Sequence, residues 1–195
     1  MIPDHTALEG QFLLAMPGMG DNRFEKSIVY LCAHSAEGSM GFIINKPLSQ
    51  PAPLEFLQQL NIITSQETNK VPAALRAGRL HAGGPVEPGR GFVLHSAEYK
   101  AETTIKVDAN VCLTATLEIL REIAVGKGPG RYLIALGYAG WSAGQLEDEI
   151  SSNGWLTTGA DADILFDGEY DSKYFRLMQQ MGINLSSLSA DAGHA

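Results

Sequence analysis

The chain has 195 residues and a formal charge of −8, because 14 lysines and arginines stand against 22 aspartates and glutamates. Hydrophobic residues make up 45% of it and charged residues 18%, which is typical of a globular protein. This composition excludes a disordered chain, a collagen, a coiled coil and a disulfide scaffold. We predict one domain over residues 1–185, with 61–78 as a candidate variable insertion, followed by a disordered tail over 186–195.

The distribution of charge argues against direct binding of nucleic acid. The segment from Trp141 to Ala195 holds nine acidic and two basic residues, and no two basic residues of the chain are adjacent. A phosphate backbone is bound by clustered lysines and arginines. Cys32 and Cys112 each lie in an apolar run, which predicts buried, reduced thiols. With no visible secretory signal and no run long enough to cross a bilayer, we expect a cytoplasmic protein without a membrane partner.

The first hundred residues are rich in strand signals. Apolar runs at 10–16 and 27–34 flank a turn over 17–22, and 41–45 pairs with 27–34 as a hairpin. Helical spacing follows over 54–60. Two further strands, 79–82 and 91–95, surround a turn that contains Gly83-Gly84-Pro85.

The second half alternates between helices and strands. A strand is expected over 103–107, an amphipathic helix over 113–125, and a buried strand over 131–138. A helix over 142–152, strands near Trp155 and 163–166, and a helix over 174–181 complete the pattern; the last is expected to end at Gly182. The fold class is therefore α+β, with a large mixed β-sheet and packed helices.

The segment Gly140-Trp141-Ser142-Ala143-Gly144 matches G-x-S-x-G, the pattern of a nucleophilic serine between a strand and a helix. The same Ser142 forms S-x-x-Q with Gln145, which is typical of a capping box at a helix start. A hydrolase of this type needs its acid and histidine after the serine, where only His194 occurs. We therefore favour the cap, and keep as the alternative a hydrolase that uses Ser142 with His34 or His95 as base.

The sequence contains no motif that indicates a bound metal or a phosphate-containing cofactor. His81 and His95 can face each other across the glycine turn, but no short pair of ligands positions a metal. No Walker or dinucleotide-binding motif is present, and the glycine-rich stretch 126–131 follows a helix instead of opening one. We predict neither a resident metal nor a cofactor.

Glycine-dense turns are the remaining candidates for a site, because glycine permits close approach of the backbone to a ligand. The predicted turns are Pro17-Gly18-Met19-Gly20-Asp21, Asn45-Lys46-Pro47, Gly83-Gly84-Pro85-Val86 and Gly137-Tyr138-Ala139-Gly140-Trp141. Each of them can equally be a tight connection within the sheet.

Four ordered signatures resemble the YqgE/AlgH family of bacterial proteins, over roughly residues 8–182. They are the runs 10–17, 27–47, 83–95 and 137–147, which include Gly83-Gly84-Pro85-Val86 and Gly137-Tyr138-Ala139-Gly140-Trp141-Ser142. The resemblance implies a compact α+β domain with a large mixed sheet and a small inserted plait-like element, in a bacterial cytosolic protein. It implies no agreed enzymatic activity, and the family's label as a transcriptional regulator reflects genetics and not a DNA-binding motif. Because the family also places Gly or Ala at the position of Ser142, the resemblance lowers the hydrolase hypothesis.

We therefore predict a binding or regulatory module with a glycine-lined cleft and with a small molecule or a protein as its partner. The side chains and backbone groups expected to bind it are Asn45, Gly83, Gly84, His95, Gly140, Trp141 and Gln145. The side-chain amides of Asn45 and Gln145 are expected to supply hydrogen bonds, and the indole of Trp141 is expected to supply a stacking face. The glycines are expected to contribute their backbone N–H groups.

Overall fold

The computed structural model describes residues 8–186, so all but the first residue of the predicted tail over 186–195 lies outside the described residues. The chain divides into two compact units. Unit 1 comprises Met1–Asn45 and Ala139–Ala195, and unit 2 comprises Lys46–Tyr138. The single domain over 1–185 and the variable character of 61–78 stay predictions.

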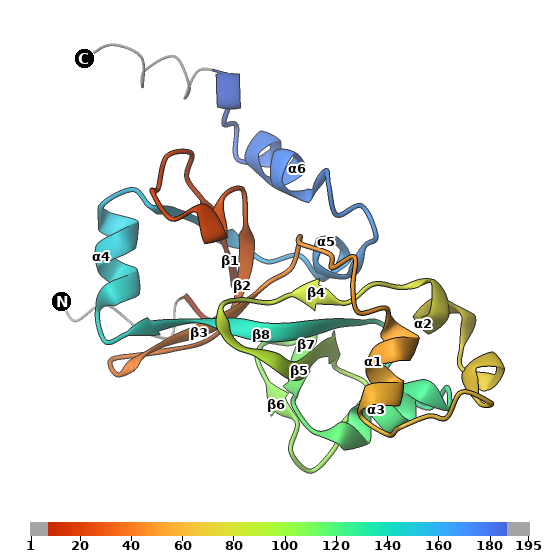
Figure 1. The fold of residues 1–195 in the computed structure, drawn as a ribbon. Coiled ribbons are helices and arrows are strands. Elements are labelled where there is room, and N and C mark those ends of the chain that lie inside the picture. The colour runs from red at the N-terminus through yellow and green to blue at the C-terminus, as the bar shows by residue number, and fades with distance from the viewer. Residues whose placement is uncertain (1–7, 187–195) are drawn as a thin grey trace. The chain divides into compact units, whose positions relative to one another are not determined.

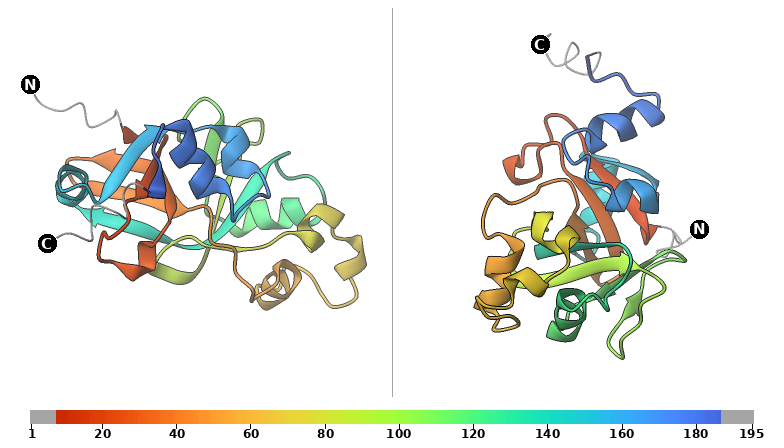
Figure 2. Two further views of the ribbon diagram at one scale, coloured as in Figure 1. Left: turned by 90° about the horizontal axis from the view of Figure 1, so that it is seen from above. Right: turned by 90° about the vertical axis from the view of Figure 1, so that its right-hand side faces the viewer.

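Unit 1 is built on antiparallel strands in the order β8-β3-β2-β1-β9 (Figure 1). They are β1 (Gln11–Ala15), β2 (Ile28–Ser35), β3 (Gly38–Ile43), the end of β8 (Tyr132–Ser142) and β9 (Trp155–Gly159). The light-blue β9 runs beside the red β1, although the two are far apart in sequence (Figure 2). The predicted hairpin of β2 and β3 is confirmed, with β3 beginning earlier than expected because Gly38 and Ser39 already pair with β2.

Short helices complete unit 1, and the sheet packs against one of them through an apolar cluster. They are η2 (Asn22–Phe24), α4 (Gln145–Ser151), α5 (Ala162–Phe166) and α6 (Lys173–Gln180). The cluster contains Leu13, Val29, Trp141, Leu146 and Trp155, drawn from four strands and α4. The helix predicted over 174–181 is confirmed, and Gly182 ends it with φ +74°, a conformation that suits glycine.

Unit 2 has the strand order β6-β7-β5-β8, with β4 also paired to β8. Its strands are β4 (His81–Ala82), β5 (Val86–Ser96), β6 (Ile105–Lys106), β7 (Val111–Thr114) and the first part of β8. The β4–β8 pair is parallel and the other pairs are antiparallel. The α+β class with a mixed sheet is therefore confirmed.

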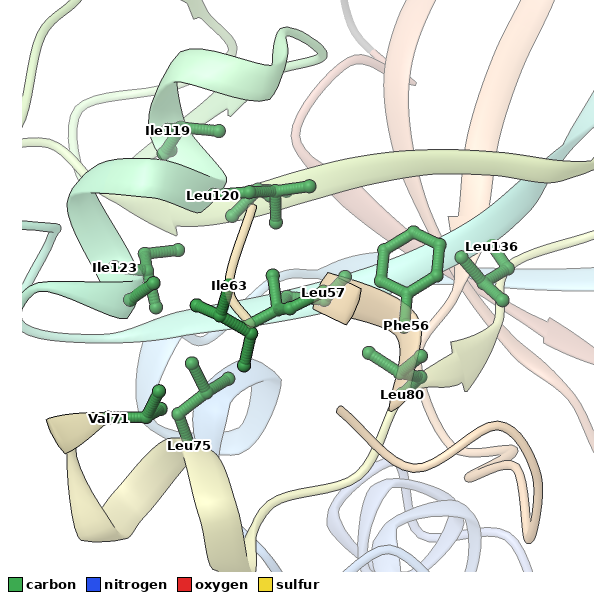
Figure 3. Close-up of a cluster of buried hydrophobic side chains, with 13 residues drawn as sticks. Phe56, Leu57, Ile63, Val71, Leu75, Leu80, Ile119, Leu120, Ile123 and Leu136 are labelled. Atoms are coloured by element: carbon green, nitrogen blue, oxygen red, sulfur yellow. The ribbon is translucent and has the colours of Figure 1, made fainter. Parts of the chain in front are cut away.

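Helices α1 (Pro53–Gln59), η3 (Thr68–Lys70), α2 (Ala73–Ala77) and α3 (Leu117–Ala124) belong to unit 2. Figure 3 shows the side chains of α3 and α1 pointing toward one another, with Leu57 opposite Leu120 and Ile123. The stretch 61–78 contributes Ile63, Val71 and Leu75 to this cluster. Helix α2 has five residues and only one buried residue, Leu75, so it contains no apolar repeat by which periodicity could predict it.

The helix predicted over 113–125 begins too early. Residues 111–114 form β7, pair with β5 and are all buried, and the helix starts at Leu117 after the N-cap Thr116. Leu113 has the right spacing for the apolar face of α3, but its β-branched neighbours favour the strand. Tertiary pairing therefore decides the boundary.

The strand predicted over 163–166 is wrong, because this segment is helix α5. The Asp161 side chain accepts a hydrogen bond from the backbone N–H of Asp163 at 2.8 Å, which caps the helix start. The buried Ile164 and Leu165 belong to its apolar face.

The glycine turn predicted over 137–141 is also wrong, since these residues lie in the interior of β8. Gly137 has φ +73°, and a side chain there would meet the Gly84 carbonyl oxygen at 2.5 Å and that of Val86 at 2.9 Å. The ladder between β5 and β8 shifts register between Val86 and Gly91. The glycine therefore marks an irregularity inside a long strand and not its end.

Both cysteines are buried free thiols, as the sequence predicts. Over residues 8–186, each helix falls short of the length and apolar character that a membrane span requires.

Candidate functional site

The predicted site residues of unit 2 serve its internal packing. The Gly83 N–H donates to the Leu136 carbonyl at 2.8 Å, and a side chain at Gly83 would collide with the carbonyl of Gly137. Gly84, with φ +156°, continues the same turn. The two glycines thus allow the β4–β5 connection to lie directly against β8.

His95 is enclosed in unit 2. Its Nε2 lies 2.8 Å from Oγ1 of Thr114 and its Nδ1 lies 3.0 Å from the Ser96 carbonyl oxygen. The side chain is fully buried, and burial lowers the pKa of this imidazole, so the neutral form is favoured. These contacts give His95 a structural role in joining β5 to β7.

In unit 1, Trp141 and Gln145 meet at one carboxylate. The indole N–H groups of Trp141 and Trp155 both donate to Oε2 of Glu149, at 2.9 and 2.7 Å. The Gln145 amide donates to the other oxygen at 2.9 Å. Glu149 therefore joins α4 to β8 and β9, and the indole of Trp141 is committed to this cluster. Gly140, also predicted, pairs with Met40 of β3.

Asn45 positions the segment that leads into β2. Its Oδ1 accepts from the Ile28 N–H and its Nδ2 donates to the Lys26 carbonyl oxygen, both at 2.9 Å. The predicted residues thus fall into two groups, Gly83, Gly84 and His95 in unit 2 and Asn45, Gly140, Trp141 and Gln145 in unit 1. Their role in binding stays a prediction.

Ser142 is the exposed last residue of β8 and not a helix cap. Helix α4 has Gly144, at φ +75°, as its N-cap, and only the glutamine half of the predicted capping box forms, with the Ser142 N–H donating to Oε1 of Gln145 at 3.0 Å. The side-chain cap fails because α4 begins only at Gln145, so Ser142 lies two residues before the N-cap position, which Gly144 occupies.

His34, one of the two candidate bases for Ser142, pairs with a different serine. Nδ1 of His34 lies 2.6 Å from Oγ of Ser39, and its Nε2 lies 3.4 Å from Oε1 of Glu147. The residues have the order of a catalytic triad, but His34 is 5% exposed and Ser39 9%. A nucleophile must reach its substrate, so the burial of both His34 and Ser39 fits a structural role better than hydrolysis.

An open cleft in unit 1 lies between the β1–β2 loop and the C-terminal helix. Its volume is about 470 Å³. We name it the loop–helix cleft; its lining residues are Met16, Pro17, Gly18, Met19, Gly20, Asp21, Asn22, Glu25, Lys26, Tyr174, Phe175 and Leu185. This volume lies within the range of about 300–1,000 Å³ that is usual for small-molecule sites.

The walls of the loop–helix cleft are held by contacts within unit 1. Asp21 caps η2 and binds the Arg23 guanidinium through both carboxylate oxygens, and the hydrogen bond from Arg23 lowers the pKa of Asp21. On the helix side, the Tyr174 hydroxyl donates to the Ala15 carbonyl oxygen. Burial raises the pKa of Tyr174 to about 12, so the hydroxyl stays a donor. The cleft is therefore preformed.

The loop is also anchored to the tryptophan cluster. Phe24 stacks on Trp141 with ring centroids 6.4 Å apart and meets Trp155 edge-on at 5.5 Å. Met19, a lining residue, packs against the same cluster. Asn45, Trp141 and Gln145 thus support the cleft from behind without lining it.

Sequence reasoning found only part of this cleft. Its glycine turn at 17–21 was among the predicted ligand-lining turns, but none of its residues was chosen for the site. The contribution of Tyr174 and Phe175 carried no local signal, because both fit an ordinary amphipathic helix. The available signal is a pair of methionines, Met16 directly before the turn and Met19 within it, since methionine is common at adaptable binding surfaces.

The fold is an α+β fold, and the loop–helix cleft lies in unit 1, which is formed by two separate stretches of the chain. The AlgH-like family model matches residues 12–186, and the chain belongs to that family.

Two curated relatives cover nearly the whole chain. The UPF0301 protein of Methylocella silvestris is 53% identical over 189 residues, which are 96% of this chain and 92% of that protein. The UPF0301 protein of Brucella ovis is 53% identical over 191 residues, 96% of this chain and 94% of its own. The resemblance predicted from the four signatures is therefore confirmed.

Solved structures confirm the fold. The solution structure of AlgH from Pseudomonas aeruginosa matches with a TM-score of 0.78 and 39% identity, over 100% of this chain and 98% of that chain. Protein DIP2367 from Corynebacterium diphtheriae matches in fold, with a TM-score of 0.66 and 17% identity over 92% of this chain and 94% of its own. These names describe no reaction, and none of the comparisons supports a hydrolase.

Proposed function

We propose that this protein is a cytoplasmic binding module that holds a small molecule or a short segment of a protein partner in the loop–helix cleft. The observation that carries the proposal is the preformed cleft of about 470 Å³ itself. Preformed walls reduce the ordering cost of binding, so the contacts of a ligand are not offset by fixing the loop. The free thiols are usual in a reducing compartment, which supports the cytoplasm.

The lining suits binding by combined apolar and polar contact. Met16, Met19 and Phe175 offer apolar and aromatic surface, whereas Asn22 and Glu25 offer an amide and a carboxylate. A few polar groups on a mainly apolar wall are the usual composition of a ligand site. Gly18 and Gly20, with φ +81° and +87°, form the turn that shapes one rim.

Ligand binding can be followed by the fluorescence of the chain's own tryptophans. Its two tryptophans, Trp141 and Trp155, both contact Phe24 of the cleft loop, so a ligand that shifts this loop changes their fluorescence. We would screen metabolites by this signal together with thermal unfolding. A ligand at about 100 times its Kd raises the free energy of unfolding by about 2.7 kcal/mol, which is a shift of several degrees.

Asn22→Arg places a long side chain at the exposed rim of the cleft and abolishes both signals if the ligand binds there. Asn110→Arg, the same change on an exposed turn of unit 2, leaves both signals intact. A ligand whose signals persist in Asn22→Arg binds elsewhere, and the cleft then loses its assigned function. If neither metabolites nor peptides give a signal, the binding-module proposal fails.

A further inference from the structure

The charge of the protein is concentrated on the unit that carries the cleft. Unit 1 has 14 acidic and 4 basic residues, a formal charge of −10, whereas unit 2 has 8 acidic and 10 basic residues, a formal charge of +2. The net charge of −8 is therefore the sum of a strongly acidic unit and a slightly basic one. A unit of this charge attracts cations and repels anions.

The four basic side chains of unit 1 already have partners within it. Arg23 binds Asp21, and both Lys173 and Arg176 lie beside Asp167. Lys26 lies with its ammonium 5.9 Å from the centre of the Phe175 ring. All four basic side chains are thus already engaged, and unit 1 as a whole keeps its excess of negative charge.

Phe175 is the central feature of this surface. Its side chain is 51% exposed although it is aromatic. It lines the loop–helix cleft and also a second hollow of about 510 Å³, which shares Leu185 with the first and is otherwise formed by residues of α6 and of 182–184. Two hollows that share one exposed ring fit an elongated ligand better than a compact one.

The ring also has the geometry to receive a cation. Lys26 occupies its face at a distance within the limit of about 6 Å for cation–π contact, and the carboxylate-bearing Glu25 precedes Lys26 on the same rim. An incoming arginine or lysine gains both the ring and the carboxylate, while Lys26, which is exposed, can turn to solvent. The methionines of the cleft accept the apolar side chain next to that cation.

We infer that the loop–helix cleft and the adjoining hollow bind an extended, basic segment of a protein partner, with an apolar side chain in the cleft and a cationic side chain over Phe175. This inference rests on the proposed function and names the class of its partner. The charge of unit 1 steers the segment, and the apolar contact holds it.

The test uses the full-length protein and two short labelled peptides without tryptophan. One alternates lysine and leucine around a central phenylalanine, and the other has glutamate at each lysine position. Binding is followed by anisotropy of the label and by the fluorescence of Trp141 and Trp155. We expect the basic peptide to bind and the acidic one not to, with affinity falling several-fold as salt rises from about 50 to about 300 mM.

The affinities of single-residue variants for the basic peptide test where it binds. Phe175→Ala weakens binding about tenfold, as truncation of an aromatic anchor commonly does. Glu25→Lys also weakens it, whereas Lys26→Ala leaves it unchanged or tightens it. Val125→Ala, which shortens an exposed apolar side chain of unit 2, is the control that leaves affinity unchanged. Thermal midpoints near that of the wild type show that each variant is folded.

The outcomes separate this inference from the proposed function. Equal binding of both peptides, or basic-peptide binding that survives Phe175→Ala, overturns the inference. Binding of an uncharged metabolite that Asn22→Arg abolishes, with no binding of the basic peptide, overturns it as well but leaves the loop–helix cleft as a site.

Discussion

The ring of Phe24 stacks on the indole of Trp141, with their centroids 6.4 Å apart and their planes inclined by 28°. Phe24 ends η2 in the loop that lines the cleft, and Trp141 lies in β8. The contact therefore connects the loop that lines the cleft to the sheet of unit 1. Because Glu149 holds the same indole, the position of the loop also depends on α4.

The first prediction concerns that carboxylate. Glu149→Ala leaves the indole N–H groups of Trp141 and Trp155 without their acceptor inside the fold, which lowers the free energy of unfolding by about 3 kcal/mol. Asp148→Ala, at the exposed neighbouring position, costs about 0.5 kcal/mol or less. Urea unfolding followed by tryptophan fluorescence measures both, and equal losses would contradict the role assigned to Glu149.

A second prediction tests the contact between His34 and Ser39. His34→Ala lowers the free energy of unfolding by about 2 kcal/mol and Ser39→Ala by about 1 kcal/mol, because each removes one partner of a buried hydrogen bond. The double variant loses less than the sum, with a coupling of about 1 kcal/mol. The matched cycle of His34→Ala with Ser142→Ala is additive. Coupling in the second cycle instead of the first would revive Ser142 as the partner of a base.

Two glycines with nearly the same backbone conformation give a third prediction. Gly137 and Gly144 have φ +73° and +75°, but a side chain at Gly137 would meet carbonyl oxygens, whereas Gly144 has open space around it. Gly144→Ala therefore costs about 1 kcal/mol of conformational strain alone. Gly137→Ala costs about 3 kcal/mol or more, because the clash adds to that strain. Thermal or urea unfolding measures the loss of stability in each of the two variants. Similar losses would show that the backbone of β8 shifts to accommodate a side chain at Gly137.

A fourth prediction follows from the buried Lys173. Burial lowers its pKa from 10.5 to about 8, opposed by the nearby Asp167. Between these pH values the unfolded chain binds the proton that the folded protein has released, so the free energy of unfolding rises with pH from about 8 to 10.5. The full rise is about 3 kcal/mol at 1.36 kcal/mol per pKa unit.

Lys173→Met removes this rise, and Lys127→Met, at an exposed position, keeps it. The measurement is the difference between wild type and variant in urea unfolding at pH 7.5 and pH 10. Burial also raises the pKa values of Tyr174 and Cys112, which act in the opposite direction at high pH but are common to all three proteins. A difference that does not change with pH would refute the charge assignment of Lys173.

The sequence predicted those parts of the fold that local chemistry determines. The β2–β3 hairpin and the end of α6 at Gly182 follow from strand-forming residues and from a glycine at a position of positive φ. The segment 111–114 could not be separated from α3, because Leu113 fits a helix face and only pairing with β5 makes it strand. The local sequence at Gly137 predicts a turn, because the segment it packs against, the turn at Gly84 and Val86, is remote in sequence.

The candidate site was predicted less well for the same reason. The glycine turn at 17–21 could be recognised as a cleft-lining turn, but its opposite wall comes from Tyr174 and Phe175. Because the two walls of this cleft are so distant in sequence, no motif with a fixed spacing between residues marks it. Trp141 and Asn45, two of the residues predicted to bind a ligand, contact the loop of the cleft, and their role in binding stays a prediction.

Unit 1 consists of two stretches that are separated in the chain, and this affects the order in which its strands leave the ribosome. Unit 2 is continuous over Lys46–Tyr138, so its residues leave the ribosome as one block. The hairpin of β2 and β3 emerges first, yet β9, which completes the sheet beside β1, ends only at Gly159. At about 5–20 residues per second, the apolar strands of the nascent chain wait on the order of ten seconds for that partner. During this interval β1 presents an open, apolar edge, and an unpaired edge of this kind is where a nascent chain can pair with another chain and aggregate.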